Sequence, residues 1–127
     1  MPRQILPNLE RASIAIEKLR DYVLNPDHPR GRNKARVFKS ILGIEGKHAV
    51  ALAEIIRETL GRAAATRNVE STYGSRWETH HEIFAPNGRS AIVSVAWLFR
   101  VEQPEIPVLI TCYIDIKRQE ELRKLLI

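Results

Sequence analysis

The sequence contains a single cysteine, Cys112, which excludes an internal disulfide and a CxxC metal or redox site. No apolar run approaches the roughly 18 residues that a membrane-spanning helix needs. The N-terminal stretch "MPRQILPNLERAS" has neither the apolar core nor the small-residue cleavage site of a secretory signal. We therefore expect a cytoplasmic protein that makes no contact with a membrane.

Metal-binding and phosphate-cradling motifs are also missing. His80 and His81 are adjacent, so their side chains face opposite ways on a strand, and His48 lies on a separate predicted helix. The ligand spacing of a zinc site is therefore absent. The carboxylates are dispersed, which argues against a two-metal nuclease, and "RGRN" lacks the P-loop spacing. The sequence predicts neither a metal ion nor any other cofactor.

Acidic residues are absent from residues 28–39, although this stretch holds five cationic side chains: Arg30, Arg32, Lys34, Arg36 and Lys39. The whole 127-residue chain has a net charge of +5, so the basic excess is concentrated in one block. Such a block favours an anionic partner, with RNA as the leading candidate. A solvated cationic helix face is the alternative explanation.

The spacing of apolar residues predicts helices followed by strands, within one domain of residues 1–127. Pro2 and Pro7 make residues 1–8 an extended arm. Helices are predicted where apolar residues recur three and four positions apart, over residues 12–24, 34–43 and 46–61. The period then shortens, which predicts strands over residues 63–70, on both sides of "PNG", and over 106–116. A short charged helix of residues 117–127 ends the chain.

The strand over residues 90–100 is apolar on both faces and is expected at the centre of the sheet. Strict alternation in residues 106–116 puts Thr111 and Tyr113 on the side opposite the aliphatic residues. Helices followed by an antiparallel sheet form an α+β domain. We expect the helices to cover the aliphatic face, Trp97 to lie in the core, and Thr111 and Tyr113 to lie on a working face.

Several stretches together resemble a small bacterial domain of unassigned function, which occurs free-standing and at the C-terminal ends of polymorphic and contact-dependent toxins. They are "LPN", "EKLRDYVLNPDHPRGRNKARVFKSILGI", "YGSRW", "PNGR", "VAWLF" and "PVLITCY", and the block "LNPDHPxGxxKARVF" is the specific part. The resemblance implies a nuclease of the barnase/EndoU/colicin E5/RelE-like plan, with N-terminal helices on a four-stranded antiparallel sheet. It also implies a small acidic antitoxin-like partner. Relatives have a histidine where this chain has Asn33.

Metal-independent RNA cleavage needs a base for the 2′-hydroxyl, an acid for the leaving oxygen and cations around the transition state. His28 is the candidate acid or base because imidazole titrates near neutrality, and its rival role is that of a turn residue. Lys34 and Arg36 are candidates to hold the scissile phosphate. Thr111 and Tyr113 could donate hydrogen bonds or stack a base, although a structural role fits them equally well.

Nucleic-acid contacts away from the reacting phosphate are expected from charged or aromatic side chains at five positions: Arg30, Arg32, Lys39, Tyr73 and Arg76. The leading hypothesis is a toxin-like metal-independent ribonuclease, with tRNA as one candidate substrate, neutralised by a small partner protein. The alternative, favoured by Asn33, is a non-catalytic RNA-binding or protein-interaction module of a toxin–antitoxin-like pair. Leu125, Leu126 and Ile127 could form a homodimer contact or dock on the core.

Overall fold

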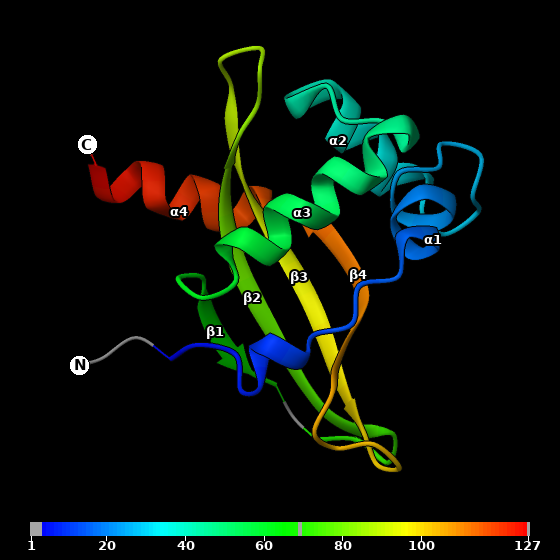
Figure 1. Cartoon of the computed structure of the whole chain (residues 1–127). Helices are drawn as coiled ribbons and strands as arrows, with labels where there is room; N and C mark the ends of the chain where they lie inside the picture. Colours follow the sequence, from blue (N-terminus) through cyan, green and yellow to red (C-terminus); the bar gives the residue numbers. More distant parts are fainter. Residues whose placement is uncertain (1–3, 69, 127) are drawn as a thin grey trace.

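The computed structural model describes residues 4–68 and 70–126 and has the predicted order of helices first and strands second (Figure 1). The helices are α1 (Ile16–Lys18), α2 (Arg32–Leu42), α3 (Ala49–Thr59) and α4 (Ile116–Leu126). The strands are β1 (Ala64–Arg67), β2 (Gly74–Phe84), β3 (Ser90–Arg100) and β4 (Pro107–Ile114). They form one antiparallel sheet in the order β1-β2-β3-β4, so the predicted α+β class, four-stranded sheet and short C-terminal helix are confirmed.

The first predicted helix, over residues 12–24, is mostly not α-helical. A 3₁₀ turn spans Leu9–Arg11, α1 follows with three residues, and the chain then widens into a π-helical turn over Leu19–Val23. The Leu24 N–H bonds the Leu19 carbonyl at 2.8 Å, one residue further back than in an α-helix. This wider turn lets Leu19, Val23 and Leu24 all reach the core.

The other two N-terminal helices follow the predicted pattern. α2 ends at Gly43, whose φ of +67° is the left-handed conformation that glycine favours at helix ends. The α3 stripe is buried as expected, from Ala49 to Leu60. Within the described residues, no helix has the length and apolarity needed to cross a membrane.

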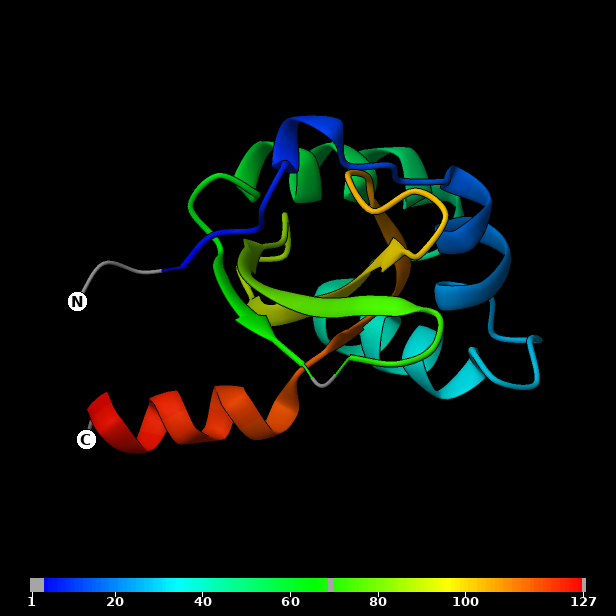
Figure 2. The same ribbon diagram turned by 90° about the horizontal axis from the view of Figure 1, so that it is seen from below.

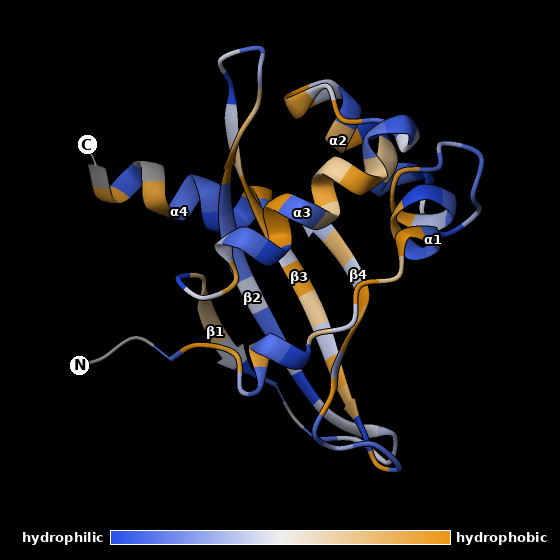
Figure 3. Cartoon of the chain, in the orientation of Figure 1, coloured by the Kyte–Doolittle hydropathy of each residue, from blue (hydrophilic) through white to orange (hydrophobic). Residues whose placement is uncertain are grey.

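α3 and α4 lie on opposite sides of the sheet (Figure 2). The strand β3 is buried on both faces; its inner face, on the α3 side, contributes to the main core, and Trp97 is completely buried there as expected. β3 is mostly apolar, whereas β2 is mostly hydrophilic (Figure 3). The predicted hairpin joins these two strands, with Gly88 at φ +84° in its turn.

The predicted strict alternation in β4 is wrong, because a β-bulge interrupts the strand. Ala96 pairs with Thr111, but the next residue, Trp97, pairs with Leu109. One extra residue therefore lies in β4, so that Ile110 and Thr111 are both half-buried between inward-facing neighbours. The bulge is what lets Leu109 and Cys112, three positions apart, both enter the core.

The chain ends differ in how they pack. Residues 1–3 of the predicted arm lie outside the described part; Gln4 accepts a hydrogen bond from Ala65 of β1 at 3.0 Å, and Leu6 is buried. At the other end, Leu125 is 81% exposed, so its predicted docking on the core is wrong. The Leu126 side chain and Ile127 lie outside the described residues, and a homodimer contact stays a prediction.

A chain of buried hydrogen bonds crosses the inner face. The Trp97 indole N–H donates to Thr79 Oγ1 (2.8 Å), which lies 2.7 Å from His81 Nε2. His81 Nδ1 lies 2.6 Å from Thr59 Oγ1, whose hydroxyl donates to the Ile55 carbonyl (2.7 Å). Because each hydroxyl has one hydrogen, Thr59 accepts from His81 Nδ1–H and Thr79 donates to His81 Nε2. His81 is therefore a neutral imidazole with its proton on Nδ1.

Candidate nucleic-acid interface

The outer face of the sheet is polar where α4 does not cover it. Cross-strand pairing places its side chains in three rows: His80–Ser94–Tyr113, Glu78–Ala96–Thr111 and Arg76–Leu98–Val108. We call these nine residues the open face. The row direction is set by the register of β2, β3 and β4, so residues distant in the sequence become neighbours. Hydroxyl, imidazole, carboxyl and guanidinium groups are thereby gathered on one surface.

The middle of the open face is organised by Tyr113 and Ser94. The Tyr113 hydroxyl interacts with both Ser94 and Glu78, which act on its pKa in opposite directions. Burial raises the pKa of Tyr113, and the nearby Glu78 and Asp115 carboxylates raise it further. The phenol consequently keeps its proton at neutral pH and remains a hydrogen-bond donor.

Tyr22 stands at the β4 margin of the open face, brought there by the π-helical turn. Its hydroxyl accepts a hydrogen bond from Lys34 Nζ at 3.2 Å. The ammonium groups of Lys34 and Lys18 lie 5.3 Å and 6.0 Å from the centre of the Tyr22 ring. Three side chains from two helical segments thus form a compact cationic margin beside the sheet.

Thr111 connects this margin to the open face. Its hydroxyl oxygen is fully buried and makes no hydrogen bond of good geometry within the described residues. The Tyr22 hydroxyl nevertheless interacts with it and gains stabilisation of its ionised form. The contact between the Tyr22 and Thr111 hydroxyls is a weak hydrogen bond, because it lowers the pKa of Tyr22 although its geometry is poor.

The pKa of Tyr22 reflects the electrostatic potential at the cationic margin. Burial alone would raise this pKa, but hydrogen bonds with Thr111 and Lys34 and the charges of Lys34 and Lys18 outweigh burial. The pKa is therefore lowered. A lowered phenol pKa in a half-buried position means that the site favours negative charge, which is the property expected where a phosphate binds.

His28 packs on the cationic margin and also accepts hydrogen bonds from the loop before α2. Its ring makes an edge contact with the Tyr22 ring, with centroids 4.9 Å apart. Its Nδ1 accepts hydrogen bonds from the backbone N–H groups of Arg30 (3.0 Å) and Gly31 (3.1 Å), just before α2. In the neutral ring the proton therefore lies on Nε2. The remaining nitrogen can donate to an anion, whereas accepting a proton would require the loop contacts to break.

Gly31 fixes the distance between Tyr22 and α2. Its φ of −90° suits any residue, but an added Cβ would collide with the Tyr22 carbonyl oxygen. We expect Gly31→Ala to destabilise the fold by about 1–3 kcal/mol, because backbone must move to make room. Urea unfolding would measure this loss.

Gly61→Ala is the matched control for that variant, because a Cβ at Gly61 would meet no atom within 4 Å. Its stability should stay within about 0.5 kcal/mol of the wild type. Equal stabilities of the two variants would show that the Tyr22–Gly31 contact does not constrain the loop.

The residues predicted from the sequence lie around the cationic margin and the open face. Lys34, His28 and Thr111 meet around Tyr22, and Tyr113 lies on the same face as Thr111. The other cations of the basic block are exposed along α2 and the loop before it: Arg30, Arg32, Arg36 and Lys39. Asn33 is also exposed, on the first turn of α2.

Two predicted contacts lie nearer the other end of the sheet. Arg76 belongs to the third row of the open face and is half-buried. Tyr73 is 76% exposed in the turn before β2. Their roles in nucleic-acid binding stay predictions.

The sequence reasoning missed Lys18 and Tyr22 of the cationic margin, and Glu78, His80 and Ser94 of the open face. Tyr22 was hidden because a regular helix would not turn it toward α2. The signal for the open-face residues was present, since Glu78 and His80 alternate with inward residues in β2 and pair with Ala96 and Ser94 in the register of the hairpin.

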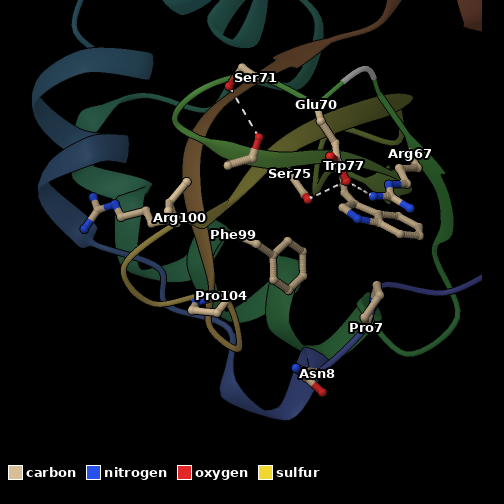
Figure 4. A pocket seen from close by; sticks show the side chains of 12 residues that line it. Pro7, Asn8, Arg67, Glu70, Ser71, Ser75, Trp77, Phe99, Arg100 and Pro104 are labelled. Atoms are coloured by element: carbon tan, nitrogen blue, oxygen red, sulfur yellow. Dashed lines mark hydrogen bonds and ion pairs between the residues drawn. The ribbon is translucent and has the colours of Figure 1, made fainter.

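A separate pocket of about 420 Å³ lies at the far end of the sheet, between the N-terminal segment and the strand turns (Figure 4). Trp77 and Phe99 line it, and the Arg67–Glu70 ion pair lies at its side. Trp77 and Phe99 belong to the inner face, so this pocket is not part of the open face.

The fold is a small α+β domain in which one sheet face is polar and partly uncovered. The chain belongs to a family of domains of unknown function, DUF6883, which matches residues 5–116. A chain in a solved contact-dependent growth inhibition toxin–immunity protein complex from Klebsiella pneumoniae 342 is similar in fold, with a TM-score of 0.57 and 18% identity. The match covers 85% of this chain and 97% of that chain. Comparison with curated proteins finds no match.

Proposed function

We propose that this chain is a toxin-like domain that binds RNA across the open face and cleaves it without a metal ion. The observation that carries the proposal is the cationic margin, where Lys18 and Lys34 flank Tyr22 and lower its pKa. Phosphate groups are drawn to such a margin by charge. The adjoining open face supplies the partly exposed Tyr113 hydroxyl as a donor for a strand of RNA.

Each predicted residue takes a role that its position supports. Lys34 and the Tyr22 hydroxyl hold a backbone phosphate at the β4 margin, and His28 donates through Nε2–H. Tyr113 keeps its proton and can supply it to the leaving 5′-oxygen. The exposed cations of the basic block and Arg76 follow the backbone on either side, and Tyr73 offers a ring for a base.

A small acidic protein would neutralise such a domain by covering the same surface. The support is charge complementarity, because the basic block is exposed beside the open face. The similar fold in a toxin–immunity protein complex is consistent with this pairing. A partner bound there would compete with RNA, and its association would weaken with added salt.

Incubation with total RNA in EDTA tests the proposal. We expect the wild type to fragment RNA but not DNA, because the 2′-hydroxyl is the nucleophile. His28→Ala should lose cleavage together with stability, since it removes an acceptor for two backbone N–H groups. Intact RNA after incubation with folded wild-type protein would overturn the proposal.

The alternative is a non-catalytic RNA-binding or protein-interaction module. The observation that favours it is the engagement of His28 Nδ1 by the loop before α2, which fits a turn residue. Such a module would bind RNA with a steep salt dependence and leave it intact. The EDTA assay, read beside a binding curve, separates the two functions.

A further inference from the structure

The open face contains an imidazole, His80, whose orientation is fixed from one side. His80 Nδ1 lies 2.8 Å from Ser94 Oγ, and Ser94 donates its hydrogen to Asp115 Oδ2 at 2.9 Å. Ser94 can therefore only accept from His80, so His80 carries its proton on Nδ1. Its Nε2 lone pair faces Thr66 Oγ1 of β1 at 3.3 Å, a long hydrogen bond that an RNA hydroxyl would have to displace.

The support behind His80 is rigid. Ser94 is completely buried, and the Asp115 side chain is 17% exposed. Asp115 Oδ1 accepts the Arg118 backbone N–H at 3.0 Å, so the carboxylate caps the start of α4. Position at a helix N-terminus stabilises its negative charge. A fixed anion thus lies one hydroxyl away from the imidazole.

We propose that His80 is the general base of the open face and Tyr113 its general acid, acting on a phosphodiester of RNA. This inference rests on the proposed function. The attacking and leaving oxygens of an in-line displacement lie on opposite sides of phosphorus. His80 and Tyr113 lie on opposite sides of Ser94, on the strands that flank β3; His80 Nδ1 bonds Ser94 Oγ, and Ser94 also acts on the Tyr113 phenol.

The reaction has two proton transfers, one to His80 and one from Tyr113. His80 Nε2 takes the 2′-hydroxyl proton as the 2′-oxygen bonds to phosphorus and the bond to the 5′-oxygen breaks. Tyr113 gives its proton to the departing 5′-oxygen, which leaves a 2′,3′-cyclic phosphate and a 5′-hydroxyl. The imidazolium is stabilised through Ser94 by Asp115, which makes these two positioning residues. Water then restores both protonation states.

The surroundings shift the pKa values of His80 and Tyr113 in opposite directions. Burial lowers the pKa of His80 and Arg118 lowers it further, while Glu78 and Asp115 oppose the shift. Burial and the same two carboxylates raise the pKa of Tyr113. At neutral pH His80 is therefore a free base and Tyr113 a protonated acid. Opposite pKa shifts in a pair of neighbouring groups indicate this division of roles.

The space beside His80 admits a ligand. A pocket of about 370 Å³ opens between β1, β2 and α4. The charged or titratable groups that face His80 from these elements and from β4 are Arg62, Glu78, His81, Glu82, Asp115 and Arg118. Imidazole from solution can enter a pocket of this size, so chemical rescue is a usable measurement.

The test is RNA cleavage in EDTA by wild-type and variant proteins across pH. His80→Asn keeps a donor toward Ser94 but has no base, and we expect cleavage to fall by about 10²- to 10⁴-fold with RNA affinity unchanged. Added imidazole should restore part of the activity of His80→Ala. Asp115→Asn should lower kcat without changing KM and shift the acid limb of the pH profile to lower pH.

His48→Gln is the matched control, because His48 lies in the turn before α3 and bonds Glu45. It should cleave as the wild type does. Nitrogen NMR of the free protein should show the Nδ1–H tautomer of His80, lost in Ser94→Ala. Wild-type cleavage that His80→Asn leaves unchanged overturns this inference and spares the proposed function, whereas wild-type protein that leaves RNA intact overturns both.

Discussion

Replacing Lys34 by methionine will lower RNA cleavage by about 100-fold and raise the pKa of Tyr22. Methionine keeps an apolar stem against the Tyr22 ring but removes the ammonium group that donates to the Tyr22 hydroxyl at 3.2 Å. With the hydrogen bond and charge of Lys34 gone, only Thr111 and Lys18 oppose the effect of burial, so the phenol becomes harder to ionise. In the proposed site the RNA phosphate would lose the Lys34 ammonium group at the same time.

Two measurements separate these effects. Cleavage of total RNA in EDTA gives the first, and titration of the Tyr22 ring by NMR gives the second, without any need for activity. Lys47→Met is the matched control, because Lys47 is exposed in the turn before α3 and away from the cationic margin. A Tyr22 pKa unchanged in Lys34→Met would contradict the electrostatic account, and unchanged cleavage would remove Lys34 from the site.

Acidification from pH 6.5 to 4 will destabilise the protein by about 3 kcal/mol through His81 alone. Burial lowers the pKa of His81 from 6.5 to about 4, and the charges of His80 and Arg62 act in the same direction. The unfolded chain therefore binds a proton in this window while the folded protein does not. Stability is present above pH 6.5 and is lost as pH falls toward 4, at about 1.4 kcal/mol per pH unit.

The hydrogen-bond chain explains why the folded protein resists this proton. His81 Nε2 accepts from Thr79, whose oxygen already accepts from the Trp97 indole. If His81 Nε2 were protonated, its N–H and the Trp97 indole N–H would both point at the Thr79 oxygen. The hydrogen of the Thr79 hydroxyl would then lose its acceptor. The lowered pKa of His80 adds a smaller loss of the same sign.

Urea unfolding at pH 7, 5.5 and 4.5 would measure the effect. His81→Gln keeps polar contacts and cannot titrate, so its stability curve should be flatter than that of the wild type although its stability at pH 7 is lower. His48→Gln, which alters a half-buried histidine outside this hydrogen-bond chain, should keep the wild-type slope. Parallel pH slopes for the wild type and His81→Gln would show that His81 does not control acid stability.

The sequence was sufficient for the elements whose apolar spacing is regular. The stripe of α3, the hairpin around Gly88 and the inward position of Trp97 all follow from local periods of 3.6 and 2. Two errors share a physical cause. The π-helical turn at Leu19–Val23 and the bulge beside Thr111 each insert one residue that tertiary packing requires and local periodicity does not reveal.

The site was predictable in part for the same reason. Lys34 and Thr111 were predicted from residue chemistry, and in the structure both interact with Tyr22. Tyr22 itself depends on the π-helical turn, so its position follows from packing rather than from sequence spacing. His80 was considered as a metal ligand and set aside. Its relation to Ser94 and Asp115 exists only once the register of β2, β3 and β4 is known.

The bulge in β4 makes one position of the strand different from all others when chain length changes. Deleting a residue elsewhere in β4 inverts the side of every residue beyond it, because alternation has a period of two. Deleting Ile110 instead removes the surplus residue and leaves Leu109 and Cys112 inward and Tyr113 outward. The chain can therefore change in length at this point and keep both the core and the outer face of the sheet in phase.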